Sequence, residues 1–320
     1  MKKIGKIFTL IGVVLVIVGS IIFIKALGDN NWSFESLNSS RLVETPFDFN
    51  DDINDILIDS DTSDIRISKS NDGINKVVCK GPEKLIHQVT LENRTLKIIT
   101  HNASKWYENL FTIGNYSITL YLVDTEFNSL TVDESTGDIN IVEGFTFNSM
   151  DIEASTGDLK ISSCKINSLD IDLSTGDITL ENIASNNIDI EVSTGTVECE
   201  ELNCKENLFI KVSTGKVTLN DSKSKNFTSS GSTGDLYINN YLAEETINIK
   251  RNTGDVIFVK MDAQEICIKT STGRVSGTLC SDKIFFIETN TGKKVYPQTT
   301  SGGKCEITTD TGDIIIQIEK

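Results

Sequence analysis

The chain has 320 residues, of which 38% are hydrophobic and 7% aromatic, and its formal net charge is −16 from 30 basic and 46 acidic residues. Such a surface repels nucleic acid and anionic lipid, which argues against both as partners. Few helix-favouring runs occur after the first thirty residues, and the abundance of Ile, Asn, Asp, Ser and Thr is typical of many short strands joined by polar turns.

The N-terminal segment predicts a membrane anchor. Residues 7–24 (IFTLIGVVLVIVGSIIFI) carry no charge and are long enough for a transmembrane helix. Lysines precede this run and the first acidic residue is Asp29, so the positive-inside rule places the N-terminus in the cytoplasm and the rest of the chain outside. We therefore expect residues 1–27 to form a cytoplasmic stub and a single-pass anchor in the cell membrane. A cleaved signal peptide is the alternative, which the length of the run disfavours.

The next segments predict a linker and an irregular cap. Residues 28–45 lack periodicity and are expected to form a juxtamembrane linker. Residues 46–130 are expected to form an irregular β N-terminal cap, because terminal repeats of solenoids are usually atypical. Within that cap, Val89–Thr100 resembles a hairpin with its turn at Glu92-Asn93-Arg94. Tyr116–Val123 alternates and is expected to be the strand that leads into the regular stack.

The cap contains two further distinctive segments. Asp61–Ile67 resembles a degenerate first copy of the repeat, with Ser63 in place of its glycine. Trp106–Phe111 is the densest aromatic cluster outside the apolar N-terminal run. We expect it to cover the exposed strand edge of the first coil, because an open edge invites aggregation. The alternative is that it forms a binding patch.

A repeat of 19 or 20 residues dominates the rest of the chain. Apolar residues occupy the second and fourth places after each repeat glycine, and a second alternating run leads to the next one, so each period predicts two short strands with one buried face. Only stacking of successive coils buries that face. We therefore expect residues 131–320 to form an all-β, single-stranded parallel β-solenoid of about ten coils, roughly 48 Å long at about 4.8 Å per coil. A Thr-Gly dipeptide marks each period, with its glycine at positions 137, 157, 176, 195, 215, 234, 254, 273, 292 and 312.

The residue after each repeat glycine is usually aspartate. Six periods have Asp there, and the other four have Thr196, Lys216, Arg274 and Lys293. Calcium needs six to eight oxygen ligands, whereas this row supplies one carboxylate per coil. We therefore interpret the row as turn capping and expect no metal site, with a calcium site as the alternative.

Residues that could carry chemistry are few. The only histidines, His87 and His101, have no cysteine or carboxylate at zinc-motif spacing, and no G-x-S-x-G motif occurs. The seven cysteines do not align in neighbouring coils, so disulfides between coils are not indicated. Cys199 is expected to pack as a small hydrophobic residue and Cys267 to face outward as a reactive thiol. We expect no catalytic, cofactor-binding or metal-binding residue.

The repeat resembles a known family. The alternating strand Tyr116–Val123, followed by Leu130–Ile141 (LTVDESTGDINI) and its copies, resembles the bacterial putative-adhesin β-strand-repeat family. The resemblance covers roughly residues 46–320. The family is a domain of unknown function that is common in envelope proteins of Gram-positive bacteria, and the resemblance implies a β-helix-like stack. It implies no catalytic residues. The chain departs from the family in its many regular coils and in Asp124, where a proline is often found.

The function expected from the sequence is therefore display outside the membrane. We predict a non-enzymatic cell-envelope protein, either an adhesin or an accessory of envelope signalling, with an envelope protein or a glycan as its partner. The alternative is a cell-surface polysaccharide lyase or hydrolase on a β-helix scaffold. That class needs long loops to build a cleft, and the regular spacing between Gly137 and Gly312 leaves no room for them. Departures from the repeat are the expected binding surface, namely Trp106, Tyr107, Phe111, Lys216 and Lys293.

Overall fold

The computed structural model describes residues 2–29, 42–82, 85–101, 116–142 and 144–319. Its one helix in those ranges, α1 (Lys2–Asp29), contains the apolar segment 7–24. No helix among the described residues combines the length and the hydropathy that a membrane crossing requires.

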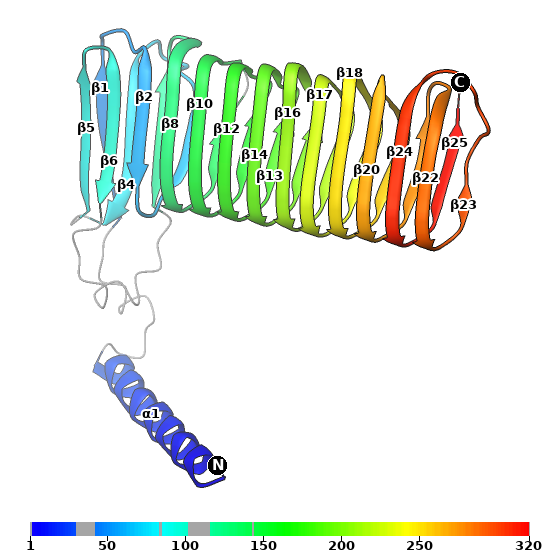
Figure 1. Ribbon diagram of the computed structural model, residues 1–320. Helices are drawn as coiled ribbons and strands as arrows, with labels where there is room; N and C mark the ends of the chain where they lie inside the picture. Colours follow the sequence, from blue (N-terminus) through cyan, green and yellow to red (C-terminus); the bar gives the residue numbers. More distant parts are fainter. Residues whose placement is uncertain (1, 30–41, 83–84, 102–115, 143, 320) are drawn as a thin grey trace.

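The strands form a β-solenoid with two sheet faces joined by turns (Figure 1). We call the face with the longer strands the long face. In spatial order it contains β5 (Ile86–Glu92), β6 (Thr95–His101), β2 (Asp55–Ser60), β8 (Glu126–Thr136), β10 (Thr146–Thr156), β12 (Lys165–Thr175), β14 (Ala184–Thr194), β16 (Asn203–Thr214), β17 (Val217–Thr233), β18 (Leu236–Thr253), β20 (Glu265–Thr272), β24 (Gly303–Thr311) and β22 (Lys283–Thr291).

The opposite, short face contains the second strand of each coil. The first parts of β17 and β18 belong to it, because these two strands run through both faces. The other members, in spatial order, are β1 (Leu42–Phe49), β4 (Asn75–Pro82), β7 (Ser117–Leu122), β3 (Asp64–Lys69), β9 (Ile139–Ile141), β11 (Leu159–Ser162), β13 (Ile178–Glu181), β15 (Val197–Glu200), β19 (Val256–Asp262), β21 (Val275–Leu279), β25 (Ile314–Ile318) and β23 (Lys294–Val295).

The core is a set of aliphatic rows that run along the rod. Parallel in-register pairing places Ile152, Ile171 and Ile190 above one another, and all three are buried. Their sequence neighbours point outward, as the alternating burial of β12 shows. The all-β, parallel solenoid predicted from the period-two alternation is therefore confirmed.

The repeat glycines stack in one column at the turns. All ten have positive φ, for example 145° at Gly176. A side chain at Gly176 would also collide with the carbonyl oxygen of Gly157 in the preceding coil. Glycine is required here for two reasons, since only glycine adopts this conformation cheaply and only glycine lets the coils approach.

A second row of left-handed residues lies at the opposite corner of the coils. Six residues after the glycine, the chain bends through non-glycine residues with φ near 50°: Ser163, Asn182, Glu201, Asp221, Asn240 and Lys260. The sequence pattern predicts a polar bend between the two strands of each coil, but it did not single out these residues or their left-handed conformation. The recurrence of Asn, Asp and Ser at one offset was the available signal, because short polar side chains tolerate this conformation.

The order of the coils is inverted at both ends of the rod, which corrects the expectation of a sequential stack. At the C-terminal end, β24 lies between β20 and β22, although it follows β22 in the chain. The inserted coil has the better core, because Cys305, Ile307 and Ile316 are buried there, whereas the inward Phe285 and Ile287 of β22 are only half-buried. The coil with the weaker apolar pattern therefore takes the outside position.

The cap shows the same inversion. Coil β2–β3, which contains Ser63 of the degenerate copy, lies between coil β6–β7 and coil β8–β9. The predicted strand at 116–123 is present as β7, which directly precedes β8 in the chain but pairs with β3 and β4 and not with a strand of the regular stack. The predicted hairpin is confirmed as β5–β6, whose turn residues Asn93 and Arg94 have φ of 50° and 64°. Antiparallel β5 and β1 form the ends of the two faces.

Candidate functional site

The aspartates that follow the repeat glycines are occupied in holding the coils together. The amide of Asp158 donates to Oδ1 of Asp138 at 2.8 Å, and that of Asp177 donates to Oδ1 of Asp158 at 2.9 Å. The same bond recurs from Asp255 to Asp235 at 2.8 Å. Each carboxylate caps one donor of the next coil, which supports the interpretation of the row as turn capping. Across the described ranges, no three His, Cys, Asp or Glu side chains gather as a metal ion would require.

The predicted binding residues do not form one site. The cluster Trp106, Tyr107 and Phe111 lies outside the described residues. Lys216 places its Nζ 5.4 Å from the centre of the Tyr237 ring and 3.9 Å from Oε1 of Glu198. Lys293 is exposed on the last coil, where its amide donates to Oδ1 of Asp313 at 2.8 Å. Five coil steps separate these two lysines, about 24 Å at ~4.8 Å per step.

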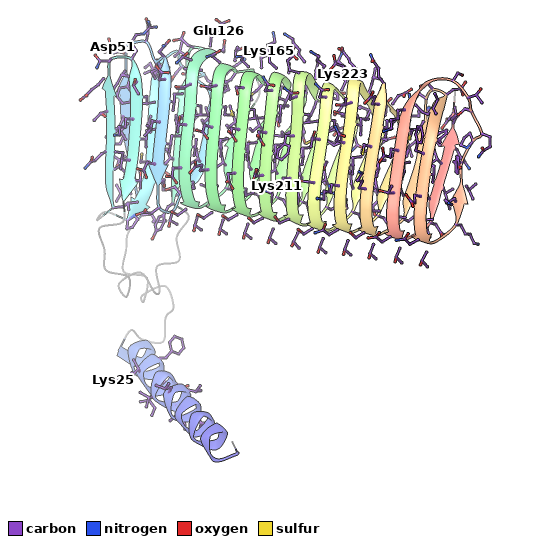
Figure 2. The ribbon with its side chains drawn as sticks, in the orientation of Figure 1. Lys25, Asp51, Glu126, Lys165, Lys211 and Lys223 are labelled. Carbon is purple, nitrogen blue, oxygen red and sulfur yellow. The ribbon has the colours of Figure 1, made fainter. Side chains whose placement is uncertain are left out.

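A series of concave surfaces lies at the corner opposite the glycine turns. Three adjoining hollows, of about 420, 530 and 490 Å³, run along this corner. The first two share Asn203, and the last two share Leu242 and Asp262. They form one groove, which begins near Glu126 on β8 and ends near Gly303 on β24, roughly 40 Å at about 4.8 Å per coil. Glu126, Lys165 and Lys223 mark its position in Figure 2.

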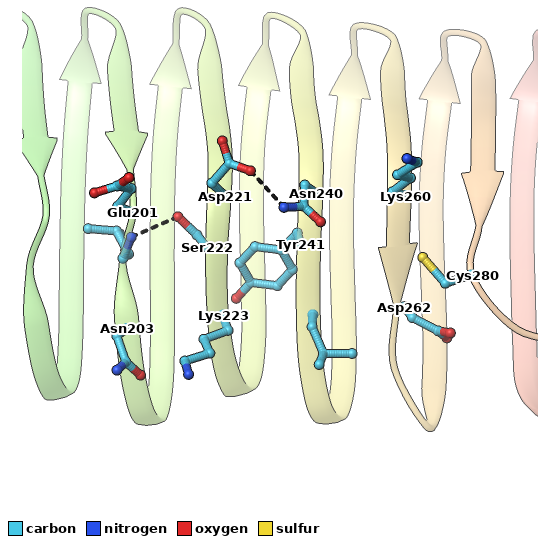
Figure 3. A pocket seen from close by; sticks show the side chains of 12 residues that line it. Glu201, Asn203, Asp221, Ser222, Lys223, Asn240, Tyr241, Lys260, Asp262 and Cys280 are labelled. Carbon is cyan, nitrogen blue, oxygen red and sulfur yellow. Dashed lines mark hydrogen bonds between the residues drawn. The ribbon is translucent and has the colours of Figure 1, made fainter. Parts of the chain in front are cut away.

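The middle of the groove has two polar walls and a buried floor (Figure 3). One wall is part of the left-handed row, where Nδ2 of Asn240 donates to Oδ1 of Asp221 at 2.6 Å. The floor includes Tyr241, which is 1% exposed and shares a hydrogen bond of 2.6 Å with Oγ of Ser224. Burial raises the pKa of the Tyr241 hydroxyl, so it stays neutral. The floor therefore sets the depth of the groove, and the polar side chains of the walls are the groups that a ligand could contact.

Asparagine side chains line the other part of the groove as a ladder. Nδ2 of Asn167 donates to Oδ1 of Asn148 at 3.3 Å, and Asn186 continues the ladder by donating to Asn167. Beside them, Lys165 and Lys205 line the same hollow. The groove thus offers neutral amides at coil spacing and the ammonium groups of two lysines.

The histidine site that the structure describes gives no sign of catalysis. Nδ1 of His87 lies 3.2 Å from Oγ1 of Thr100 at the cap end of the rod. Burial lowers the pKa of His87, so the ring is neutral near pH 7. The side chain of His101 lies outside the described set.

All seven cysteines are free thiols. Cys199 is buried among the aliphatic rows, as predicted, and Cys267 is half-exposed on the long face. The exposed thiol is Cys280, which lines the groove and which sequence analysis did not single out. The sequence held one signal for this exposure. Cys280 directly follows Leu279, the last buried residue of β21, so alternation places its side chain outward.

The chain is similar to one protein family and to several solved structures. The model of the family "Toastrack DUF4097" matches residues 53–223, which is 171 of the 320 residues. No curated protein sequence matches. A putative adhesin from Bacteroides fragilis is 19% identical, with a TM-score of 0.46, and the match covers 76% of this chain and 97% of that chain. A putative adhesin from Parabacteroides distasonis is 13% identical, with a TM-score of 0.41, over 85% of this chain and 98% of that chain. A putative cell adhesion protein from Clostridium sporogenes is 11% identical, with a TM-score of 0.25, over 87% of this chain and 100% of that chain.

Proposed function

The chain belongs to the Toastrack DUF4097 family, and from that premise we propose that it is a non-enzymatic adhesin of the cell envelope, held by its N-terminal helix and displaying the solenoid outside the membrane. The observation that carries this proposal is the regular stack with a groove along it. The repeated polar side chains of the stack form hydrogen bonds between coils. The hollows of the groove are shallow and follow the rod, unlike the deep cleft with convergent acid and base groups that an enzyme of this kind uses.

The groove is the proposed contact surface, and an extended polymer is the ligand that fits its shape. Its main-chain groups already bond from coil to coil, as Ala184 to Cys164 at 3.1 Å and Asn203 to Ile183 at 2.8 Å. A peptide therefore finds no unpaired edge to extend along the groove. A glycan strand needs none, because side-chain amides and amines bind its hydroxyl groups. We therefore propose a glycan as the ligand of the groove.

The N-terminal helix supports the membrane part of the proposal. Residues 7–24 carry no charge, and the helix α1 exposes Leu15, Val16 and Ile22 by 66%, 69% and 64%. Such a contiguous apolar surface is unfavourable in water and favourable in lipid. Lysines on the N-terminal side of the run support a cytoplasmic position for that end.

Labelling of Cys280 on intact cells tests the location. With the full chain expressed in a Gram-positive host, a membrane-impermeant maleimide is expected to label the exposed thiol. The Cys280→Ser variant should lose most of the label, because the remaining cysteines are buried or half-exposed. Full labelling that requires cell lysis would overturn the proposed orientation, and release of the chain by alkaline carbonate would overturn the anchor.

Binding of purified cell-wall polysaccharide to the full chain in detergent tests the function. Retention should fall in a Lys165→Ala, Asn167→Ala variant of the groove and persist in Lys160→Ala, which removes an exposed lysine of the short face. Turnover of the polysaccharide would favour the lyase or hydrolase alternative and contradict the proposal. Equal retention of the polysaccharide by both variants would show that the groove is not the binding surface.

A further inference from the structure

The hollow of about 420 Å³ in the groove is lined by two lysines that have no acidic partner. Lys165 and Lys205 both line it and are exposed. Among the described residues, neither ammonium group takes part in an ion pair or a hydrogen bond. Glu126 is the one carboxylate among the described lining residues, and in-register pairing sets it two coil steps from Lys165. The hollow is therefore locally cationic on a chain that is acidic as a whole.

A small residue makes the space between these lysines. One register column along the groove consists of Thr146, Lys165, Ala184, Asn203 and Lys223. Lys205 takes in β16 the place that Asn186 has in β14, because Cys204 is the in-register partner of Ser185. Lys165 therefore lies one coil before Ala184 and Lys205 one coil after it, each at a step of about 4.8 Å.

The amides beside the lysines add further donors. Asn167 and Asn186 each donate from Nδ2 to the ladder. A side-chain amide has two hydrogens on its nitrogen, so each keeps one that the ladder does not use. Two lysine side chains and these amides thus border the space above Ala184. Hydrogen bonds from ammonium groups to an anionic oxygen are stronger than those between neutral groups.

We propose that this hollow holds an anionic group of the glycan, a carboxylate or a phosphodiester, between Lys165 and Lys205. The inference rests on the proposed function and narrows its ligand to acidic polysaccharides. Lys223 is also without an ion pair among the described residues and lines the next hollow. It lies three coil steps from Lys165 on the same column, so a second anionic group about 14 Å along the polymer would meet it.

Carboxylates near the hollow are paired or distant. Glu206, which follows Lys205, is paired with Lys225 at 3.2 Å. Asp170 lies five residues beyond Lys165 on β12, about 16 Å at roughly 3.3 Å per residue. The Debye length is about 8 Å at physiological ionic strength, so more distant charges are largely screened. The net charge of −16 therefore does not prevent an anionic group from binding here.

Nucleic acid is another anionic polymer, and this hollow lacks the groups that bind it. Proteins hold single strands by stacking bases on aromatic side chains. The aromatic residues of the hollow, Phe127 and Phe147, are 6% and 1% exposed, and they stack on each other with ring centres 5.5 Å apart. An acidic polysaccharide needs no stacking surface, because its hydroxyl groups bond to side-chain amides.

Matched polymers, tested for binding to the full chain in detergent, measure the role of charge. Polygalacturonate and its methyl ester share a backbone and differ in their carboxylates, and poly(glycerol phosphate) supplies phosphodiester groups. We expect at least one of the two anionic polymers to bind roughly tenfold more tightly than the methyl ester. The polymer that binds identifies the source of the anionic group.

Two double variants locate the contact. Lys165→Gln, Lys205→Gln should weaken binding of the anionic polymer roughly tenfold and leave binding of the methyl ester unchanged. Lys97→Gln, Lys250→Gln is the matched control, because it removes as many positive charges from exposed residues of the long face outside the hollows. It should change binding by less than about twofold, since these charges are screened from the hollow.

Four outcomes would overturn the inference. They are equal affinity for the methyl ester, equal losses in the two double variants, failure of both anionic polymers to bind, and tighter binding of a single-stranded oligonucleotide of the same length. Retention of cell-wall polysaccharide by the same chain reports the proposed function separately. The proposed function therefore survives where only the acidic nature of the ligand is wrong.

Discussion

The guanidinium of Arg251 occupies the space that Gly231 leaves open in the neighbouring coil. The two residues are in-register partners on β18 and β17, and a side chain at Gly231 would collide with Nη1 of Arg251. Arg251 is 2% exposed, and its Nη2 donates to Oγ of Ser229 at 2.9 Å. Its Nε has no partner among the described residues. Burial lowers the pKa of Arg251 to about 10, so the interior holds a cation at a cost in stability.

Replacing this polar pair should stabilise the rod. The double variant Arg251→Met, Ser229→Ala removes the buried cation together with the hydroxyl that would otherwise lose its partner. We expect the free energy of unfolding to rise by about 1–3 kcal/mol, as when buried charged groups yield to packed apolar ones. Urea unfolding followed by circular dichroism measures it. A lower midpoint than that of the wild type would show that the guanidinium contributes net stability.

The glycine column should be intolerant of any side chain. Gly176→Ala adds a collision with the carbonyl of Gly157 to the strain of a φ of 145°. Gly73→Ala is the matched control, because its φ is 76° and nothing lies within 4 Å of the added carbon. We expect the control to cost about 1–2 kcal/mol from strain and Gly176→Ala to cost at least twice that. Equal losses in thermal unfolding would show that the coils can move apart.

Glu134 should make stability depend on pH. It is 1% exposed, and its Oε1 accepts from the amides of Ser63 and Thr136, both at 3.1 Å. Burial raises the pKa of Glu134 to about 7 from its ordinary value of 4.5. The folded chain therefore binds more protons than the unfolded chain between these values, so this contribution falls as pH rises from 4.5 to 7 and is level above that range.

The expected loss is about 3 kcal/mol over that range, at 1.36 kcal/mol per pKa unit. Glu134→Gln should remove this slope in the urea midpoint between pH 4.5 and pH 8, and Asp133→Asn, which changes the exposed neighbour, should preserve it. Identical pH profiles for the wild type and Glu134→Gln would assign the slope to other carboxylates.

Lys283 should hold the outermost coil in place. Its Nζ lies 2.5 Å from Oδ1 of Asp262 and donates to the carbonyl oxygen of Ala263 at 2.7 Å. Its in-register partner on the inserted strand is Gly303, which leaves room for the contact. Asp262→Asn leaves the buried ammonium without its counter-charge and should cost about 3–5 kcal/mol.

Hydrogen exchange should report this loss locally, as faster exchange in residues 283–295. Glu306→Gln serves as the control, because it breaks exposed pairs with Lys269 and Lys304 and should cost less than about 1 kcal/mol. Unchanged exchange in Asp262→Asn would mean that the backbone pairing of β22 with β24 suffices.

The regular coils could be predicted because each repeats the same local sequence pattern. Alternation at Leu169, Ile171 and Leu173 specifies one buried face, and the glycine spacing specifies where each coil ends. The order of the coils at the ends could not be predicted in this way. Coils that share one pattern can stack in any order, and the choice depends on long-range packing, such as the reach of Lys283 to Asp262.

The candidate groove was also beyond reach from the pattern alone. The sequence pattern did not set Asn148 and Asn167 apart, because their contact across coils depends on the register of β10 and β12. Lys216 and Lys293 were singled out as departures from the repeat, and the rise of the coils sets them far apart. The buried Arg251 breaks the apolar pattern in the sequence, yet only its pairing with Gly231 explains how the rod holds it.

The inverted ends also dictate when the rod can be completed during synthesis. Coils up to Gly273 can dock in the order in which they emerge. Strand β22 emerges next, but its partner β24 is synthesised after it. The coil that contains β22 must therefore stay undocked until β24 arrives, or dock on β20 first and be displaced later by β24. Strand β24 thus completes the rod by inserting between β20 and β22. A nascent chain that ends at residue 300 lacks β24, so the outermost coil cannot reach its final position.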